Sequence, residues 1–439
     1  MNRRRGVDTP GDTPGIRKTS CELNGQGGGC RRVAGTPAGA WPAHQHTGTP
    51  AHRQPAHRVA GAQTHRLAGT PGGGGFPPRR SGAIPFRCGP DARAVPKGNA
   101  MEPLSDSQYR AATTGGMPDA EQVADGLWSL AMPMPGGGSL GYTLAAVHLG
   151  PDGTVALIDP GWAEPGSLER IDDFLRGLGR QMADVATVVV THAHPDHIGL
   201  ADAVRQASGA RVVLHRREQA SIDAEGAVVP EDLDSRLQEW GVAPERARLL
   251  HDRAHGSAPR HAPLHADVLV EDGDELPVAG ATWRVLHTPG HTPGHICVVD
   301  ESRGLLFSGD HVLPTVYPGL GLGADFGENP LTAYLRSLHR LHPYDDVEVV
   351  PGHGYRFRGL AGRRRDTALH ALRRVRETAE VLHDDPTASI WDIASRLSWS
   401  GGWAQLQHSI MLFSGLNQTD MYRDFVVSGG LESPEALWP

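Results

Sequence analysis

In the body of the chain, segments whose apolar residues have the pattern of strands alternate with segments whose apolar residues have the spacing of helices. The segments "GYTLAAVHLG" and "GTVALIDPG" predict two strands joined by a turn at residues 151–153. In "SLERIDDFLRGLG", apolar residues recur at Leu168, Ile171 and Leu175, the spacing of one helical face. The next run, "ADVATVVVTH", is almost continuously β-branched, as expected for a strand that is covered on both faces.

The same alternation of strands and helices continues to about residue 356. The patterns predict helices at 198–209 and 329–341, and strands at 211–215, 281–287, 295–300, 304–310 and 347–354. Because strands and helices interleave, we expect an α/β fold with sheets shielded by helices.

Beyond that point the pattern predicts only helices. "TALHALRRVRETAEVL" carries an apolar stripe, and "PTASIWDIASRL" and "WAQLQHSIMLF" repeat the helical spacing. A last segment, "NQTDMYRDFVVSGGL", ends at two glycines. These stripes are explained most simply as a packed core.

Residues 1–100 have a different composition from the rest. They hold 15 of the chain's 42 lysine and arginine residues but 4 of its 50 acidic residues, and glycine and proline are abundant. Such a segment buries too little apolar surface to offset its conformational entropy. We expect a disordered basic extension, with Met101 as the natural first residue and no export signal. A tail that contacts a polyanion is the alternative.

Charge and cysteine usage narrow the classes of protein. The acidic body argues against broad electrostatic binding to nucleic acid, although a local basic groove is not excluded. Cys297 is the one cysteine of the body and is expected to be a small buried residue, which fits the reducing cytoplasm. No run of eighteen apolar residues occurs, so no membrane span is expected.

The segment "TVVVTHAHPDHIGL" concentrates metal-ligand residue types directly after a predicted buried strand. His192 and His194 are two residues apart and point the same way in extended geometry, and Asp196 and His197 follow the turn at Pro195. Imidazole and carboxylate are preferred ligands of zinc and similar ions. Burying several titratable groups together is costly without a cation, so the spacing predicts a metal site.

This string resembles the HxHxDH signature of the metallo-β-lactamase superfamily. Four further segments resemble that family's other motifs in order: "ALIDPG" with Asp159, "HTPGHTPGH" with His291, "FSGDH" with Asp310 and "VVPGHG" with His353. The resemblance implies an αββα sandwich over residues 115–360, with metals at one edge.

The resemblance also implies the ligand sets. His192, His194 and His291 would bind one metal, and Asp196, His197 and His353 would bind a second. Asp310 would bridge the two ions, and Asp159 would support the ligands from outside. Two divalent ions are expected, with Zn²⁺ favoured over Mn²⁺ or Fe²⁺. Such ions lower the pKa of water towards ~7, and Asp196 is the expected catalytic residue that orients the resulting hydroxide.

The other histidines are expected to be less important. His295 lies four residues after His291 and is not expected to be a ligand. His311 and Tyr317 are candidates for reaching substrate. Four more are expected at the surface of a loop-rich stretch: His251, His255, His261 and His265.

Residues 363–439 look like the small winged-helix domain of one metallo-β-lactamase-like subgroup. A packing and pocket-forming role is expected there. A run of arginines is the best argument for nucleic-acid contact, although a solvated helix face is the plainer explanation: Arg363, Arg364, Arg365, Arg373, Arg374 and Arg376.

Three functions remain open. The first is a metal-dependent hydrolase of a small ester, thioester or related acyl substrate. The second is an endoribonuclease or phosphodiesterase acting on single-stranded RNA. The third is a mononuclear iron dioxygenase of persulfides. All seven predicted ligands are present, which favours two metals over one. Antibiotic hydrolysis is not indicated, and the oligomeric state is not predicted.

Overall fold

The computed structural model describes residues 101–135, 140–224, 233–256, 264–324, 326–409 and 411–430. The extension expected over residues 1–100 lies outside these described residues. None of the described helices has the length and apolar character needed to cross a membrane.

The first sheet has seven strands in chain order. β3, β4 and β5 are antiparallel neighbours, whereas β5, β6, β7 and β8 run parallel. The strands are β2 (Glu121–Ala124), β3 (Leu127–Pro133), β4 (Tyr142–Leu149), β5 (Val155–Ile158), β6 (Val185–Val189), β7 (Arg211–His215) and β8 (Val268–Val270).

The second sheet also has seven strands, in the order β1-β14-β13-β12-β11-β10-β9. β12 and β13 are parallel, and the other pairs are antiparallel. The strands are β1 (Glu102–Pro103), β9 (Glu275–Val278), β10 (Ala281–His287), β11 (Ile296–Asp300), β12 (Leu305–Gly309), β13 (Glu348–Pro351) and β14 (Phe357–Arg358).

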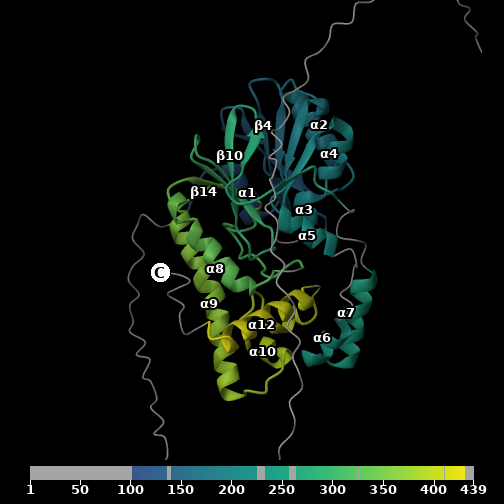
Figure 1. Ribbon diagram of the computed structural model, residues 1–439, viewed down its shortest axis with the longest axis vertical. Coiled ribbons are helices and arrows are strands. Elements are labelled where there is room, and N and C mark those ends of the chain that lie inside the picture. The colour runs from purple at the N-terminus through teal and green to yellow at the C-terminus, as the bar shows by residue number, and fades with distance from the viewer. Residues whose placement is uncertain are drawn as a thin grey trace, which may run out of the picture. The chain divides into compact units, whose positions relative to one another are not determined.

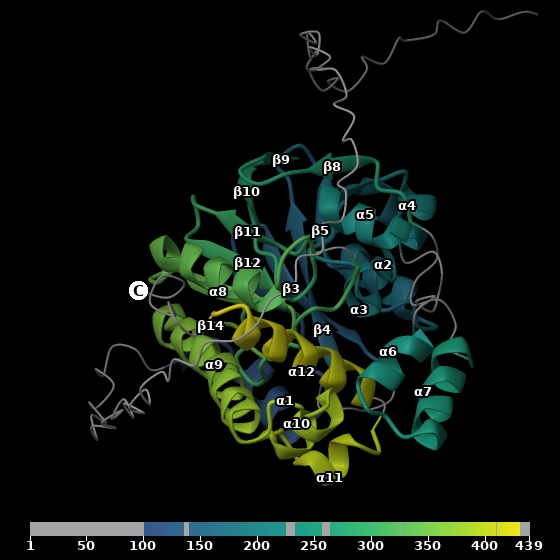
Figure 2. The same cartoon turned by 60° about the horizontal axis from the view of Figure 1, so that its bottom comes forward.

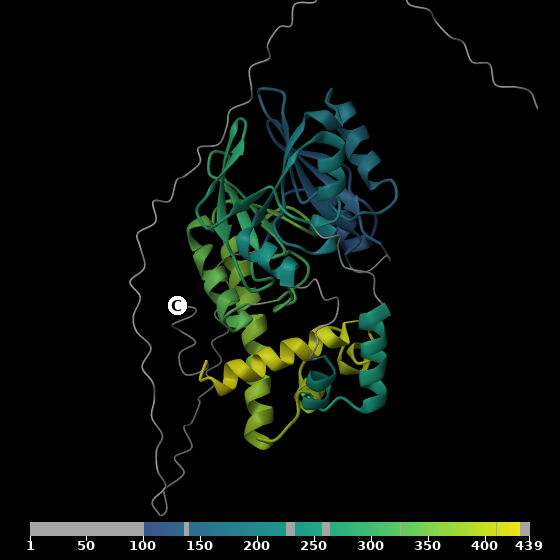
Figure 3. The same cartoon turned by 45° about the vertical axis from the view of Figure 1, so that its right-hand side comes forward.

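The two sheets pack face to face around one apolar layer. Ile158 and Val189 from the first sheet share this core with Trp283 and Phe307 from the second. Every residue of β11 and β12 is buried, as the predicted apolar runs require of strands covered on both sides. Figure 3 shows the blue strands of the first sheet beside the green strands of the second.

Helices cover both outer faces, which confirms the predicted αββα arrangement (Figure 1). α2 (Ser167–Gly177) and α4 (Ala201–Ser208) pack on the first sheet, where Ile171 and Val204 meet Val147 and Val212. α8 (Pro330–Arg340) packs on the second sheet through residues such as Leu335. The shorter elements are α1 (Asp106–Thr114), α3 (Pro195–Ile198), α5 (Arg216–Ala224) and the 3₁₀ turns Met182–Asp184 and His342–Tyr344.

The C-terminal region is helical, as predicted. It comprises α9 (Leu360–Asp384), α10 (Ile390–Arg396), α11 (Trp403–Leu406) and α12 (Leu412–Val427). Its core also includes α6 (Leu233–Glu239), which lies between β7 and β8 in the chain and packs beside α12 (Figure 2). The backbone N–H of Trp391 donates to the Trp240 carbonyl at 2.9 Å and ties α10 to the end of α6.

Two local predictions were wrong. The expected helix over residues 403–413 breaks after α11, where the Ser409 hydroxyl donates to the Leu406 carbonyl and accepts from the Met411 N–H. The stretch expected to be loop-rich begins with α7 (Pro244–Gly256). A polar helix of this kind has too weak an apolar stripe to be recognised from its sequence.

Candidate metal centre

The predicted ligands from the first sheet lie at the carboxyl end of β6. The chain leaves the sheet after Val189, and His192 is fully buried directly after Thr191. His194 is the N-cap of α3, and Pro195 occupies the first helical position, where its fixed φ suits the turn. This single turn of helix carries Asp196 and His197, so the loop presents four side chains at one edge.

The ligands from the second sheet arrive at the same edge. Asp310 follows β12 and His353 follows β13. Because these strands are parallel neighbours, their carboxyl ends lie together. Gly352 has to be glycine here, because a Cβ at this position would lie 2.6 Å from Asp310 Oδ1 and 2.7 Å from His197 Cε1. His291 comes from the loop between β10 and β11.

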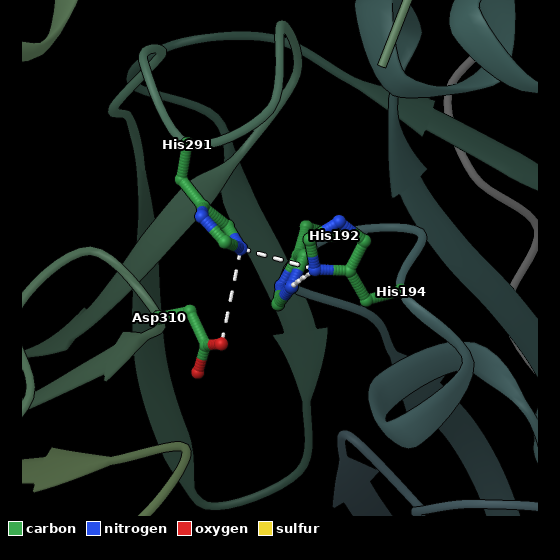
Figure 4. Close-up of side chains that lie close together, drawn as sticks. All are labelled: His192, His194, His291 and Asp310. Atoms are coloured by element: carbon green, nitrogen blue, oxygen red, sulfur yellow. Dashed lines mark hydrogen bonds and ion pairs between the residues drawn. The ribbon is translucent and has the colours of Figure 1, made fainter. Parts of the chain in front are cut away.

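The first group consists of His192, His194, His291 and Asp310 (Figure 4). His194 Nδ1 lies 2.9 Å from His192 Nε2 and 3.0 Å from His291 Nε2. His291 Nε2 lies 3.8 Å from Asp310 Oδ2. Nitrogen ligands about 2.0–2.1 Å from one tetrahedral zinc ion are separated by about 3.3 Å, so these spacings suit one shared ion.

The second group consists of Asp196, His197 and His353. Asp196 Oδ2 lies 3.0 Å from His353 Nε2 and 3.7 Å from His197 Nε2. Asp310 Oδ1 lies 3.4 Å from His197 Nε2 and 3.5 Å from His353 Nε2. Asp310 therefore directs one oxygen towards each group, as the family resemblance implies for a bridging ligand.

In each buried histidine of the two groups, the ring nitrogen that faces away from the centre contacts another group of the protein. The outward nitrogen Nδ1 contacts Asp159 Oδ2 in His197 (2.8 Å), Thr191 Oγ1 in His192 (3.1 Å), the Gly319 carbonyl in His291 (2.6 Å) and the Tyr142 carbonyl in His353 (2.8 Å). Such contacts fix the ring and its tautomer and leave Nε2 for an inward ligand.

Asp159 is the one described non-glycine residue with a positive φ, 51°. This strained backbone places its carboxylate where it also accepts from the backbone N–H and the hydroxyl of Thr191. Asp159 therefore joins the end of β5 to the loop that carries the predicted ligands.

Three inward atoms have no hydrogen-bond partner among the described residues. His197 Nε2, His353 Nε2 and Asp310 Oδ1 are buried and make no hydrogen bond, although charged groups surround them. Buried polar atoms are almost always paired, so a cluster of unpaired atoms facing one another indicates a missing partner. A divalent cation fits, because imidazole and carboxylate are its donors.

The pKa values of the histidines move in opposite directions in the two groups. Burial and its histidine neighbours hold the pKa of His192 well below 6.5, and burial lowers that of His194 to about 3. Burial also disfavours charge on His353, but Asp310 and Asp196 outweigh it and raise the pKa to about 10. The carboxylates, Asp159 first, likewise outweigh burial and raise the pKa of His197. The carboxylates therefore favour positive charge on this side of the site, which a protonated histidine or a divalent cation supplies.

The structure therefore brings all seven predicted ligands together. Sequence reasoning missed the Thr191 hydroxyl and the carbonyls of Tyr142 and Gly319. Thr191 could have been suspected because it precedes His192, whereas the two carbonyls carry no signal in residue type.

The remaining histidines lie outside both groups. His295 is buried, and its Nδ1 contacts the Thr288 hydroxyl while its Nε2 accepts from the Asp310 N–H. His311 is fully buried against Tyr334. The hydroxyl of Tyr317 donates to Asp366 at 2.7 Å.

The loop histidines differ among themselves. His265 is exposed, as expected, whereas His251 lies on α7, half-buried, with Nδ1 2.9 Å from Asp234. The side chain of His255, and all of His261, lie outside the described residues.

Comparison with known proteins agrees with the fold. Residues 144–353 match the model of the metallo-beta-lactamase superfamily. A metallo-beta-lactamase family protein from Thermus thermophilus is 27% identical and superposes with a TM-score of 0.58, over 70% of this chain and 95% of that one.

Two curated relatives carry names of hydrolases. The hydroxyacylglutathione hydrolase GloC of Haemophilus influenzae is 27% identical over 202 residues, 45% of this chain and 79% of that protein. An atrochrysone carboxyl ACP thioesterase of Paecilomyces divaricatus is 34% identical over 139 residues, 32% of this chain and 41% of that protein. The fold and these names support a metallo-hydrolase.

Proposed function

We propose that this chain, whose residues 144–353 match the metallo-β-lactamase superfamily, is a metal-dependent hydrolase of a small ester, thioester or related acyl substrate. The observation that carries the proposal is the convergence of seven donor side chains in two adjacent groups, with unpaired inward atoms. We propose His192, His194 and His291 as ligands of one ion, Asp196, His197 and His353 as ligands of a second, and Asp310 as the bridge.

Two divalent ions, with zinc favoured, would supply a nucleophilic hydroxide at neutral pH and polarise a substrate oxygen. The protein's own part is to orient and to move a proton. Asp196 is the proposed proton acceptor, because it lies among the ligands yet its side chain is 11% exposed. Burial opposes its ionisation, but His197 and His353 outweigh it and lower the pKa of Asp196 to about 2. The group therefore stays a carboxylate at neutral pH.

An acyl substrate is favoured over RNA. The relatives named above are a thioesterase and a hydroxyacylglutathione hydrolase. Three of the six arginines that suggested nucleic-acid contact, Arg363, Arg364 and Arg374, are buried and bound within the protein. Their charges are therefore not presented to a phosphate backbone.

Two donor groups rather than one favour a binuclear site over a mononuclear iron dioxygenase. We further propose that residues 115–360 are the catalytic domain and 363–439 a winged-helix-like domain with a packing role. The described residues of the latter are helical, and the proposed boundary falls in the first turn of α9. The free, buried thiol of Cys297 suits a reducing compartment such as the cytoplasm.

The test combines elemental analysis with a substrate screen on the full chain. We expect about two transition-metal ions per chain and metal-dependent hydrolysis of thioesters or esters. The same preparation is assayed against lactones, β-lactams, labelled single-stranded RNA and glutathione persulfide. A preparation that cleaves RNA but no acyl substrate, or that consumes oxygen with the persulfide, would replace the proposed reaction.

A further inference from the structure

Glu218 joins two of the loops that carry the proposed ligands, although it belongs to neither donor group. α5 starts directly after β7, and Glu218 lies in its first turn with its side chain buried, 1% exposed. Oε1 accepts from the backbone N–H of Ala193 at 2.8 Å. Oε2 accepts from the Thr292 hydroxyl at 2.9 Å and from the backbone N–H of Gly294 at 2.8 Å.

These contacts lie next to the ligands in the chain. Ala193 stands between His192 and His194, and Thr292 directly follows His291. One carboxylate therefore spans the two loops that supply the three histidines of the first group. The loops come from different sheets, so their separation depends on contacts of this kind rather than on either sheet alone.

The close packing at Gly294 supports the same conclusion. A Cβ at this position would lie 2.1 Å from the Glu218 nitrogen and 2.6 Å from its Cα, so backbone rests on backbone. Only glycine permits this approach. The start of α5 is thus a fixed platform for the His291 loop, and Glu218 is the side chain that fastens the loop to it.

We propose that Glu218 is a positioning residue that sets the affinity of the first group for a divalent cation by fixing His291 relative to His192 and His194. The inference rests on the metal centre of the proposed function. Ionised glutamate suits the role because both oxygens accept, and the two loops together present three donors. Glutamine offers one oxygen, and its amide group would face an N–H that cannot accept.

The test measures zinc affinity rather than activity. Full-length wild type and Glu218→Gln are stripped of metal and titrated with zinc against a chromophoric chelator. We expect Glu218→Gln to bind one of its two ions about 10–100-fold more weakly, the usual cost of losing a partner behind a ligand, and the other with near-wild-type affinity. Glu169→Gln is the control, because Glu169 is an exposed residue in the first turn of α2.

A second variant keeps the test decisive if Glu218→Gln does not fold. Thr292→Val removes one of the three contacts and should weaken the same ion about fivefold, the value of one hydrogen bond. Unchanged dissociation constants in the folded variants would overturn the proposal. So would a lower melting temperature of the metal-free protein without any change in those constants, since that pattern marks a purely structural role.

The inference can fail independently of the proposed function. Wild type that binds two ions but hydrolyses no acyl substrate would refute the function and leave the role of Glu218 measurable. Wild type that binds no zinc would refute both.

Discussion

The metal centre and the C-terminal helices both bury charged side chains, but they pair them differently. On α9, the guanidinium of Arg363 donates to the carbonyls of Leu313 and Val316 and to Asp366. Arg364 donates to both oxygens of Asp345. At the edge of the sandwich, by contrast, His197 and His353 face carboxylates with no hydrogen bond from Nε2.

The pairing of a buried charge therefore adds information that its burial alone does not give. A buried charge whose donors all find acceptors needs no further partner. A buried cluster whose inward atoms face one another without partners needs a further component. In the sequence the run of arginines and the run of histidines both suggest a binding function, yet among the described residues only the histidines belong to groups that could hold a metal ion.

The largest expected effect comes from removing a proposed ligand of the metal centre. Asp310→Ala should lower kcat/KM at least about a thousandfold, because it removes a shared ligand of a site worth several kcal/mol to the transition state. Metal content should fall as well, while the circular dichroism spectrum stays like that of wild type. His265→Ala, an exposed histidine outside both groups, is the matched control. Full activity in Asp310→Ala would refute the ligand assignment.

Removing a charge that is paired within the protein should lower stability and leave the metal centre unchanged. Arg364→Met leaves the half-buried Asp345 without its main cation and should lower the free energy of unfolding by about 2 kcal/mol. Metal content and kcat should stay at wild-type values. The double variant Arg364→Met, Asp345→Leu should recover part of the loss, because neither charge is then unpaired. Urea unfolding measures the first effect and elemental analysis the second. Loss of metal in the single variant would remove the distinction between the two regions.

The sequence predicted the proposed metal ligands better than it predicted the groups that contact those ligands from outside. Four of the proposed ligands follow one another directly after a predicted buried strand, so local spacing marks them: His192, His194, Asp196 and His197. The other positions were identified by their resemblance to family motifs: Asp159, His291, Asp310 and His353. The outer contacts come from backbone carbonyls such as that of Gly319 or from distant side chains such as Glu218. Those partners depend on how the two sheets pack, and no local pattern encodes that packing.

The arginines show the same limit in the C-terminal region. Helical spacing predicted that α9 exists, and its apolar stripe predicted a buried face. It did not predict that Arg363, Arg364 and Arg374 would be on that face, since their partners Leu313, Asp345 and His370 were not foreseeable as neighbours. Long charged side chains are normally assigned to solvent.

A smaller effect is expected from a stacked histidine pair outside the centre, of which His215 is buried. The rings of His215 and His287 stack 4.0 Å apart, and burial, with His287 next, lowers the pKa of His215 to about 3. The unfolded chain titrates near ~6.5, so stability is fully present above that pH and declines as pH falls towards 3, by up to about 1.4 kcal/mol per pH unit. His215→Phe should flatten this slope in chemical unfolding between pH 6 and 4. An unchanged slope would show that other groups cause the decline.

The smallest effect is expected where an arginine is exposed. Arg373 is exposed on α9, whereas its neighbour Arg374 is buried with its guanidinium 5.0 Å from the Trp399 ring. Arg373→Glu should change the free energy of unfolding by less than about 0.5 kcal/mol and leave acyl hydrolysis unaltered. Arg374→Glu should unfold the region, so a loss of RNA binding in that variant would not by itself indicate a nucleic-acid surface. Weaker RNA cleavage by the folded Arg373→Glu protein, measured beside Arg365→Glu, would restore the nuclease hypothesis and give the outer face of α9 a function.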